Sequence, residues 1–189
     1  AATLGRVLED IGASLAAAGI RRLVVCNAHG GNRAVIDTAA LRLRRDHDLL
    51  VVKAQYFRQP LPPDVVLPAE ELRHGLHGGA IETALMLALQ PDQVRLEALG
   101  PARSLGALLD RRFRQIAPEG ASSFAWLAED LHPSGAVGDA TLATPALGRR
   151  LLDHYASALA RTLDEVLQLP LRSREEGGAL IDRERLDHD

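Results

Sequence analysis

The stretch LVVCNAHGGN, from Leu23 to Asn32, decides how the rest of the chain is interpreted. Its opening apolar run predicts a buried strand, and the two adjacent glycines predict a tight turn. Asn32 is a favoured N-cap for a following helix. His29 would then lie at the carboxyl end of a parallel strand, where open α/β sheets bind their ligands. Spacing alone leaves open whether His29 is a ligand or a structural residue that caps the helix.

The segments around this stretch predict a strand–helix–strand unit. Apolar residues recur with helical period from Thr3, a predicted cap, to about Ala18. A second helix is expected over residues 32–45, followed by a turn at 46–48 and a second apolar strand over 49–56. Two strands joined through a helix at this spacing pair in parallel, so the fold class is α/β.

Prolines and a predicted helix cap indicate where the elements of the rest of the chain begin and end. Four prolines predict an irregular loop over residues 58–68, and a helix is expected over 80–89. Residues 105–116 fit either a short helix or a strand. Thr144 and Pro145 predict the cap and first residue of a long helix that runs to about 169. Residues 1–170 are expected to form one domain, and the charged residues 171–189 a flexible tail.

Composition excludes several classes of protein. The 189 residues carry a formal net charge of −3, which argues against a nucleic-acid partner. The single cysteine, Cys26, lies in the predicted buried strand and cannot form an internal disulfide, so a cytoplasmic location is expected. No apolar run is long enough to predict a membrane span, and no signal peptide is recognisable.

Histidines and carboxylates are the candidate chemical groups. His77 and Glu82 are separated by a Gly-Gly turn that leads into a helix. The apolar neighbours of Glu82 make its burial costly unless a metal, a histidine or the helix N-terminus pairs with it. Taken alone, Glu82 fits a first-turn glutamate favoured by the helix dipole. His74 is expected to be a solvated loop residue, and Asp139 either caps a turn or contacts substrate.

Three blocks of sequence resemble the creatininase (creatinine amidohydrolase) family. NAHGGN, from Asn27 to Asn32, is similar to the family's NGHGGN loop. HGGAIETA, from His77 to Ala84, is similar to its HAGxxETS segment, and GDATLAT, from Gly138 to Thr144, to its GDPxxAT block. Because the three occur in the family's order over about residues 3–169, the chain is identified as a member.

The resemblance implies a fold, a reaction and a set of site residues. The fold is a three-layer α/β/α sandwich on a mainly parallel sheet. The reaction is metal-dependent hydrolysis of a non-peptide C–N bond, in an amide, cyclic amide or formamide, by metal-activated water. His29 would bind the metal (Zn, Mn or Fe, with one or two ions), and His77 and Glu82 would be catalytic. Trp126 and Asp139 are predicted to contact a small-molecule substrate, and a homo-oligomer is expected.

Two departures from the family pattern shape these expectations. Creatininase carries a carboxylate two residues after its loop histidine, where this chain has Gly31. A second metal would lose that ligand, which favours the deformylase-like branches over creatinine as substrate. The family's Glu-x-His and Asp ligands belong to a strand upstream of the first helix, so we expect an N-terminally truncated member that lacks this strand. The alternative hypothesis is a degenerate, non-catalytic member that acts as a binding or assembly subunit.

Overall fold

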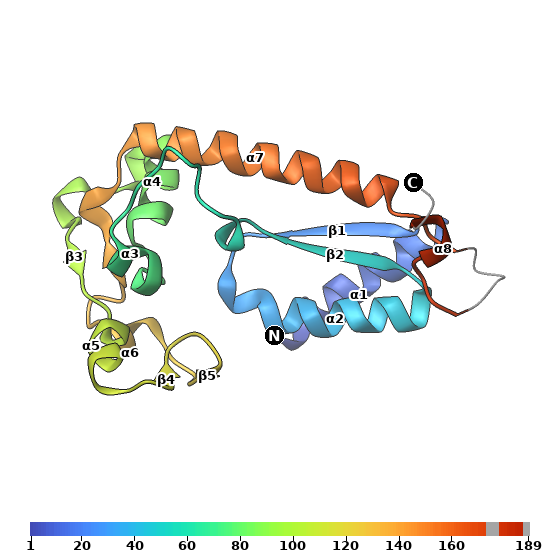
Figure 1. Ribbon diagram of the computed structural model, residues 1–189, viewed down its shortest axis with the longest axis horizontal. Coiled ribbons are helices and arrows are strands. Elements are labelled where there is room, and N and C mark those ends of the chain that lie inside the picture. The colour runs from blue at the N-terminus through green and yellow to red at the C-terminus, as the bar shows by residue number, and fades with distance from the viewer. Residues whose placement is uncertain (173–177, 187–189) are drawn as a thin grey trace. The chain divides into compact units, whose positions relative to one another are not determined.

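The computed structural model describes residues 1–172 and 178–186. The chain forms two compact units, and a single domain over residues 1–170 stays a prediction. The first unit, unit 1, contains Ala1–Pro60 and Tyr155–Asp189, and the second, unit 2, contains Leu61–His154 (Figure 1). We describe each unit by itself.

Unit 1 is built on a parallel pair of strands. Helix α1 (Ala2–Ala17) leads to β1 (Arg22–Asn27), and α2 (Arg33–His47) leads to β2 (Leu50–Gln55). Short 3-10 turns follow each strand, at Gly30–Asn32 and Tyr56–Arg58. The strands pair in parallel register, with Asn27 opposite Gln55 at their carboxyl ends. The predicted strand–helix–strand unit and the α/β class are therefore confirmed.

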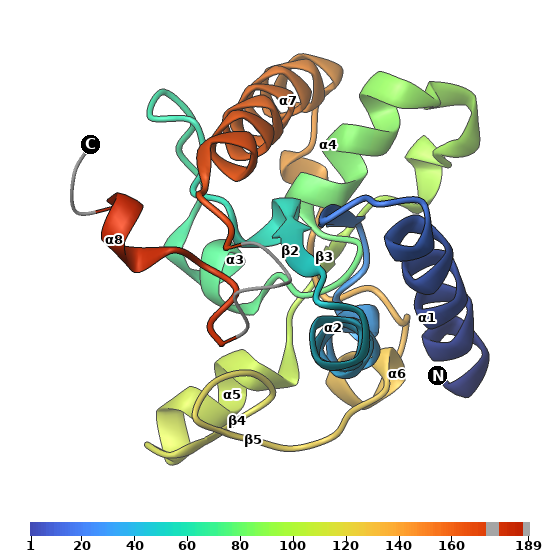
Figure 2. The ribbon, with the colours of Figure 1, turned by 90° about the vertical axis from the view of Figure 1, so that its right-hand side faces the viewer.

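Helices cover both faces of this sheet within unit 1. Helices α1 and α2 lie on one side, and the part of α7 (Pro145–Gln168) that belongs to unit 1 lies on the other (Figures 1 and 2). The Arg22 guanidinium donates to the carbonyl oxygens of Val166 and Leu169, at 2.9 and 2.7 Å. Carbonyls in the last turn of a helix have no helical partner, so Arg22 ties the end of α7 to β1.

Local expectations in unit 1 need four corrections. Ala1 occupies the N-cap of α1, and Thr3 lies inside the helix. Asn32 is the N-cap of α2 but its side chain makes no capping bond. Asp46 and His47 continue α2, which ends at Asp48 in the left-handed region. Arg21 and Arg44 each bind the Asp48 carboxylate at 2.7 Å. Cys26 is exposed rather than buried, since its side of the strand end is left uncovered.

Unit 2 consists of short elements and the first turns of α7. Its helices are α3 (Ala69–His74), α4 (Ala80–Leu89), α5 (Leu105–Arg112) and α6 (Ala128–Leu131), with 3-10 turns at Pro91–Gln93, Leu96–Ala98 and Ala140–Leu142. Strand β3 (Pro101–Ala102) pairs antiparallel with β6 (Gly138–Asp139), and β4 (Ile116–Ala117) pairs parallel with β5 (Ser122–Ser123).

Several predictions for this region are confirmed. Helix α4 has the predicted bounds, and residues 59–68 form no helix or strand. The choice left open over residues 105–116 resolves into a helix that ends at Arg112. The hydroxyl of Thr144 accepts a bond from the Leu147 amide at 3.0 Å, so Thr144 caps α7 as predicted.

The expected flexible tail lies partly outside the described residues, at 173–177 and 187–189. Its described part is attached to unit 1, because the Arg172 amide donates to the Leu180 carbonyl and the Asp182 amide to the Pro170 carbonyl, both at 3.0 Å. Leu180 and Asp182 are buried, and α8 (Arg183–Leu186) follows. Within the described ranges, no helix has the length and apolar character that crossing a membrane requires.

Close packing of α7 on α4 within unit 2 depends on Gly148. An added Cβ there would overlap the Ala84 carbonyl oxygen and lie 2.8 Å from the Ala88 Cβ. We expect Gly148→Ala to lower the free energy of unfolding by about 1–3 kcal/mol, measured by urea denaturation. Gly100→Ala is the control, because its Cβ would meet no atom within 4 Å. Equal stability of the two variants would contradict the close approach.

Candidate active site

The His29 loop in unit 1 is held by a buried asparagine at the end of β1. Asn27 is 3% exposed, and its Oδ1 accepts bonds from the His29 amide at 3.2 Å and from the Asn32 side chain at 3.4 Å. The Nδ2 of Asn27 and the Oε1 of Gln55, its register partner, are buried and have no hydrogen-bond partner among the described residues. The carboxyl end of the sheet therefore carries polar atoms that remain to be paired.

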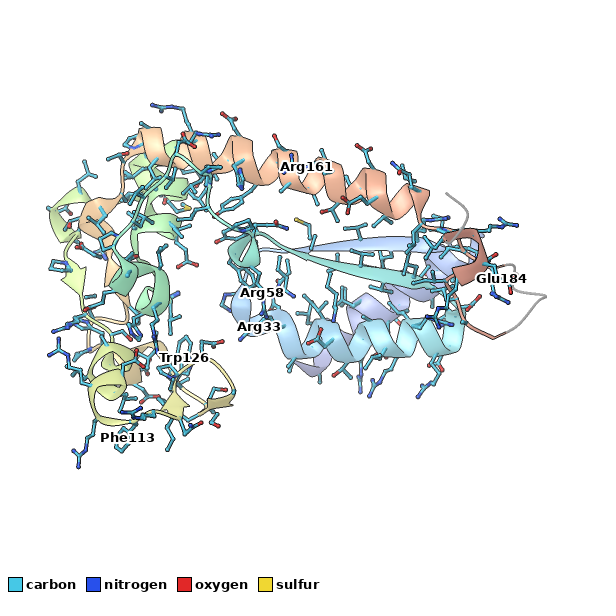
Figure 3. All side chains as sticks on the ribbon, viewed as in Figure 1. Arg33, Arg58, Phe113, Trp126, Arg161 and Glu184 are labelled. Atoms are coloured by element: carbon cyan, nitrogen blue, oxygen red, sulfur yellow. The ribbon has the colours of Figure 1, made fainter. Side chains whose placement is uncertain are left out.

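The imidazole of His29 occupies the space beside Gly31. His29 is exposed, and an added Cβ at Gly31 would lie 2.6 Å from its Nε2. A carboxylate side chain at this position would therefore require the ring to move. Arg33 and Arg58 lie at the same end of unit 1, just after the carboxyl ends of β1 and β2 (Figure 3).

In unit 2, the two predicted catalytic residues are neighbours. Glu82 lies in the first turn of α4, accepts a bond from the Gly78 amide at 2.5 Å and has its Oε2 3.8 Å from the His77 Nδ1. Both side chains are about half exposed, at 52% for His77 and 44% for Glu82. Glu82 is therefore only partly buried despite its apolar neighbours in the sequence, and a substrate can reach both groups.

Backbone pairing joins the second and third sequence blocks. The His77 amide donates to the Val137 carbonyl at 3.1 Å, and the Val137 amide donates to the His77 carbonyl at 2.6 Å. Asp139 follows two residues later in β6, and its Oδ1 accepts from the Thr141 amide at 3.0 Å. This bond caps a 3-10 turn, which agrees with the turn interpretation of Asp139 and leaves its predicted contact with substrate untested.

A residue that the sequence did not single out, Glu71 in α3, binds both of these segments. It is 8% exposed, and its Oε1 and Oε2 accept bonds from the Ala80 and Asp139 amides, each at 2.7 Å. Its neighbour Glu70 instead forms an exposed ion pair with Arg103, whose guanidinium lowers the pKa of the Glu70 carboxyl. No local pattern in the sequence distinguishes Glu71 from Glu70.

A pocket of about 210 Å³ lies within unit 2 beside α3 and β6. Asp139 and Glu71 line it, together with His74 and Ser104, whereas His77 and Glu82 do not. His74 is buried rather than solvated. Its Nε2 lies 3.1 Å from the Asp110 carboxylate, and this contact links α3 to α5. Trp126 is also absent from the lining and donates its indole N–H to the Pro118 carbonyl at 3.1 Å (Figure 3).

The part of the chain that the structure describes contains no group of three His, Cys, Asp or Glu side chains that could hold a metal ion. His29 alone does not fit a complete metal site, since catalytic metals take about three protein ligands. The predicted ligand His29 and the predicted catalytic residues belong to different units.

Comparison with known proteins gives consistent matches. The family model described as "Creatininase: Creatinine amidohydrolase" matches residues 1–163. Creatinine amidohydrolase from Pseudomonas putida is 40% identical over 106 residues, which cover 51% of this chain and 41% of that protein.

Two solved structures are also similar. A single-site mutant of creatininase superposes with a TM-score of 0.60 and 29% identity, covering 87% of this chain and 63% of the other. A candidate creatinine amidohydrolase from Bacteroides fragilis superposes with a TM-score of 0.63 and 25% identity, covering 91% of this chain and 64% of the other. The chain therefore spans less than two thirds of the length of each of these relatives.

The orientation of His29 can be tested through its two glycine neighbours. We expect Gly31→Ala to shift the ring resonances of His29 in NMR spectra, because the new Cβ would lie 2.6 Å from Nε2. Gly30→Ala is the matched control, since its Cβ would meet no atom within 4 Å. Both positions are exposed, so stability should change by no more than about 0.5 kcal/mol. Identical His29 resonances in both variants would refute this arrangement.

Proposed function

The chain belongs to the creatininase family, and we propose that this protein hydrolyses a non-peptide C–N bond in a small amide, cyclic amide or formamide. The observation that carries the proposal is the pairing of His77 with Glu82, 3.8 Å apart and both accessible, in a block that falls within the family match. A histidine beside a carboxylate is a common arrangement for moving a proton during hydrolysis.

Each group of the pair has a separate role in the proposed reaction. The Gly78 amide holds one oxygen of Glu82 in place, so the carboxylate faces the His77 Nδ1. The pair can accept a proton at these atoms and deliver it to the leaving nitrogen as the C–N bond breaks. Asp139, in the pocket lining, is proposed as a substrate contact, and Trp126 as a residue of the surrounding specificity loops.

A divalent ion, Zn, Mn or Fe, would supply the activated water in this proposal. His29 would be one of its ligands, and the described residues do not complete the set. We therefore assign no step to the metal. Because Gly31 provides no carboxylate beside His29, we propose a formamide or another amide, rather than creatinine, as the substrate. By analogy with the family, a cytoplasmic homo-oligomer is proposed.

A second candidate function is a binding or assembly subunit without catalysis. It is favoured by one observation, the lack of a three-ligand group among residues 1–172 and 178–186. The two functions differ in whether the protein holds a metal and turns over an amide.

The catalytic pair can be tested by kinetics on a panel of formamides, cyclic amides and creatinine. We expect His77→Ala and Glu82→Gln each to lower kcat by about 10²- to 10⁴-fold, because both remove a proton-transfer group. His132→Ala is the control, since the ring of that histidine, in the same unit, is bonded to Ser134. Unchanged kcat in both variants would exclude the assigned roles.

The metal ligand can be tested by elemental analysis of the purified protein. We expect at least about one equivalent of transition metal, lost on His29→Ala and retained in His47→Ala, a histidine on α2 of the same unit. Less metal than this in the wild type, with no further loss on His29→Ala, would support the non-catalytic subunit instead.

A further inference from the structure

We infer that Glu71 is a positioning residue of the candidate active site, which sets the His77–Glu82 segment and Asp139 in one fixed arrangement. The inference rests on the proposed function for its catalytic consequence. Glu71 acts through backbone amides, so its effect on the reaction would be indirect.

The hydrogen bonds of Glu71 connect two segments that are distant in sequence. One oxygen binds the amide of Ala80, the first residue of α4, and the other binds the amide of Asp139 in β6, each at 2.7 Å. Bonds from amides to a buried carboxylate are short and about twice as strong as neutral ones. Since the residue is 8% exposed, water competes little for these amides. The carboxylate therefore fixes the start of α4 relative to β6.

Three glycines make the room that this carboxylate needs. An added Cβ at Gly75 would lie 2.6 Å from Oε1, and one at Gly79 would overlap Oε1. At Gly138, which has a φ of +143°, the Cβ would lie 3.0 Å from both oxygens and 2.8 Å from the Gly79 Cα. The second glycine of the HGG block and the glycine of the GD block are thus explained by close approach to Glu71.

Glu71 and Glu82 accept hydrogen bonds from different backbone amides near the start of α4. Glu71 binds the Ala80 amide, and Glu82 binds the Gly78 amide, which brings Glu82 beside His77. The first amides of a helix have no helical partner and attract negative charge. Without Glu71, the Ala80 amide would need another acceptor, and Glu82 is the nearest acidic side chain of this helix. Glu71 therefore keeps Glu82 available to His77.

The test compares Glu71→Gln with Glu70→Gln, a neighbouring glutamate that is exposed and paired with Arg103. A glutamine side chain offers only one carbonyl oxygen, so one of the two amides loses its acceptor. We expect hydrogen exchange to accelerate by about 10- to 100-fold at one or both of the Ala80 and Asp139 amides in Glu71→Gln, and at neither in Glu70→Gln. The folded fraction is determined by circular dichroism, and kcat per folded molecule should fall about tenfold or more.

Two results in a folded Glu71→Gln protein would overturn the inference. One is uniform acceleration of exchange across unit 2, which indicates a general structural role. The other is an unchanged kcat per folded molecule. If the wild type hydrolyses no amide, the proposed function fails, and the exchange rates alone then decide whether Glu71 fixes these two segments.

A second variant keeps the inference testable if Glu71→Gln does not fold. Gly79→Ala retains the carboxylate but places a Cβ against its Oε1, whereas Gly100→Ala adds a Cβ in open space. We expect Gly79→Ala alone to accelerate exchange at Ala80 and Asp139. Equal exchange rates in the two glycine variants would refute the role of Glu71.

Discussion

The start of α4 depends on side chains that accept hydrogen bonds from backbone amides without a helical partner. Glu71 and Glu82 provide these acceptors, and the first also binds the Asp139 amide in β6. A buried carboxylate is costly unless it is fully hydrogen-bonded, and here amides from two segments compensate it. The glycines at positions 79 and 138 follow from this constraint, because only a residue without Cβ lets both backbones approach the carboxylate.

In unit 1, a neutral side chain and a cationic side chain bind backbone groups at the two ends of β1. Asn27, buried at the end of β1, accepts a hydrogen bond from the His29 amide and so fixes the direction of the loop. Arg22, at the other end of the same strand, donates to the last carbonyls of α7. The strand therefore organises its surroundings at both ends through side chains, while its middle residues contribute parallel pairing with β2.

The sequence predicted those features that depend on neighbouring residues. Continuous apolar runs located both strands, punctuating residues delimited α4, and Thr144 with Pro145 marked the start of α7. Glu71 was missed because one of its partners lies 68 residues away, and a glutamate beside a second glutamate gives no local sign of burial. His74 was misplaced for the same reason, since its partner Asp110 comes from α5. Cys26 was assigned to the interior because a continuous apolar run predicts a buried strand, whereas this residue of β1 is exposed.

Gly31 bears both on the comparison with the creatininase family and on the orientation of the His29 ring. The resemblance to the creatininase family led us to expect a carboxylate at this position, where the chain has a glycine. In the structure, the same position is the space that the His29 ring occupies, with Nε2 2.6 Å from where a Cβ would lie. The two statements are linked, because a side chain at this position and the observed ring orientation exclude one another. A side chain at position 31 would therefore change the orientation of the His29 ring as well as the groups beside it.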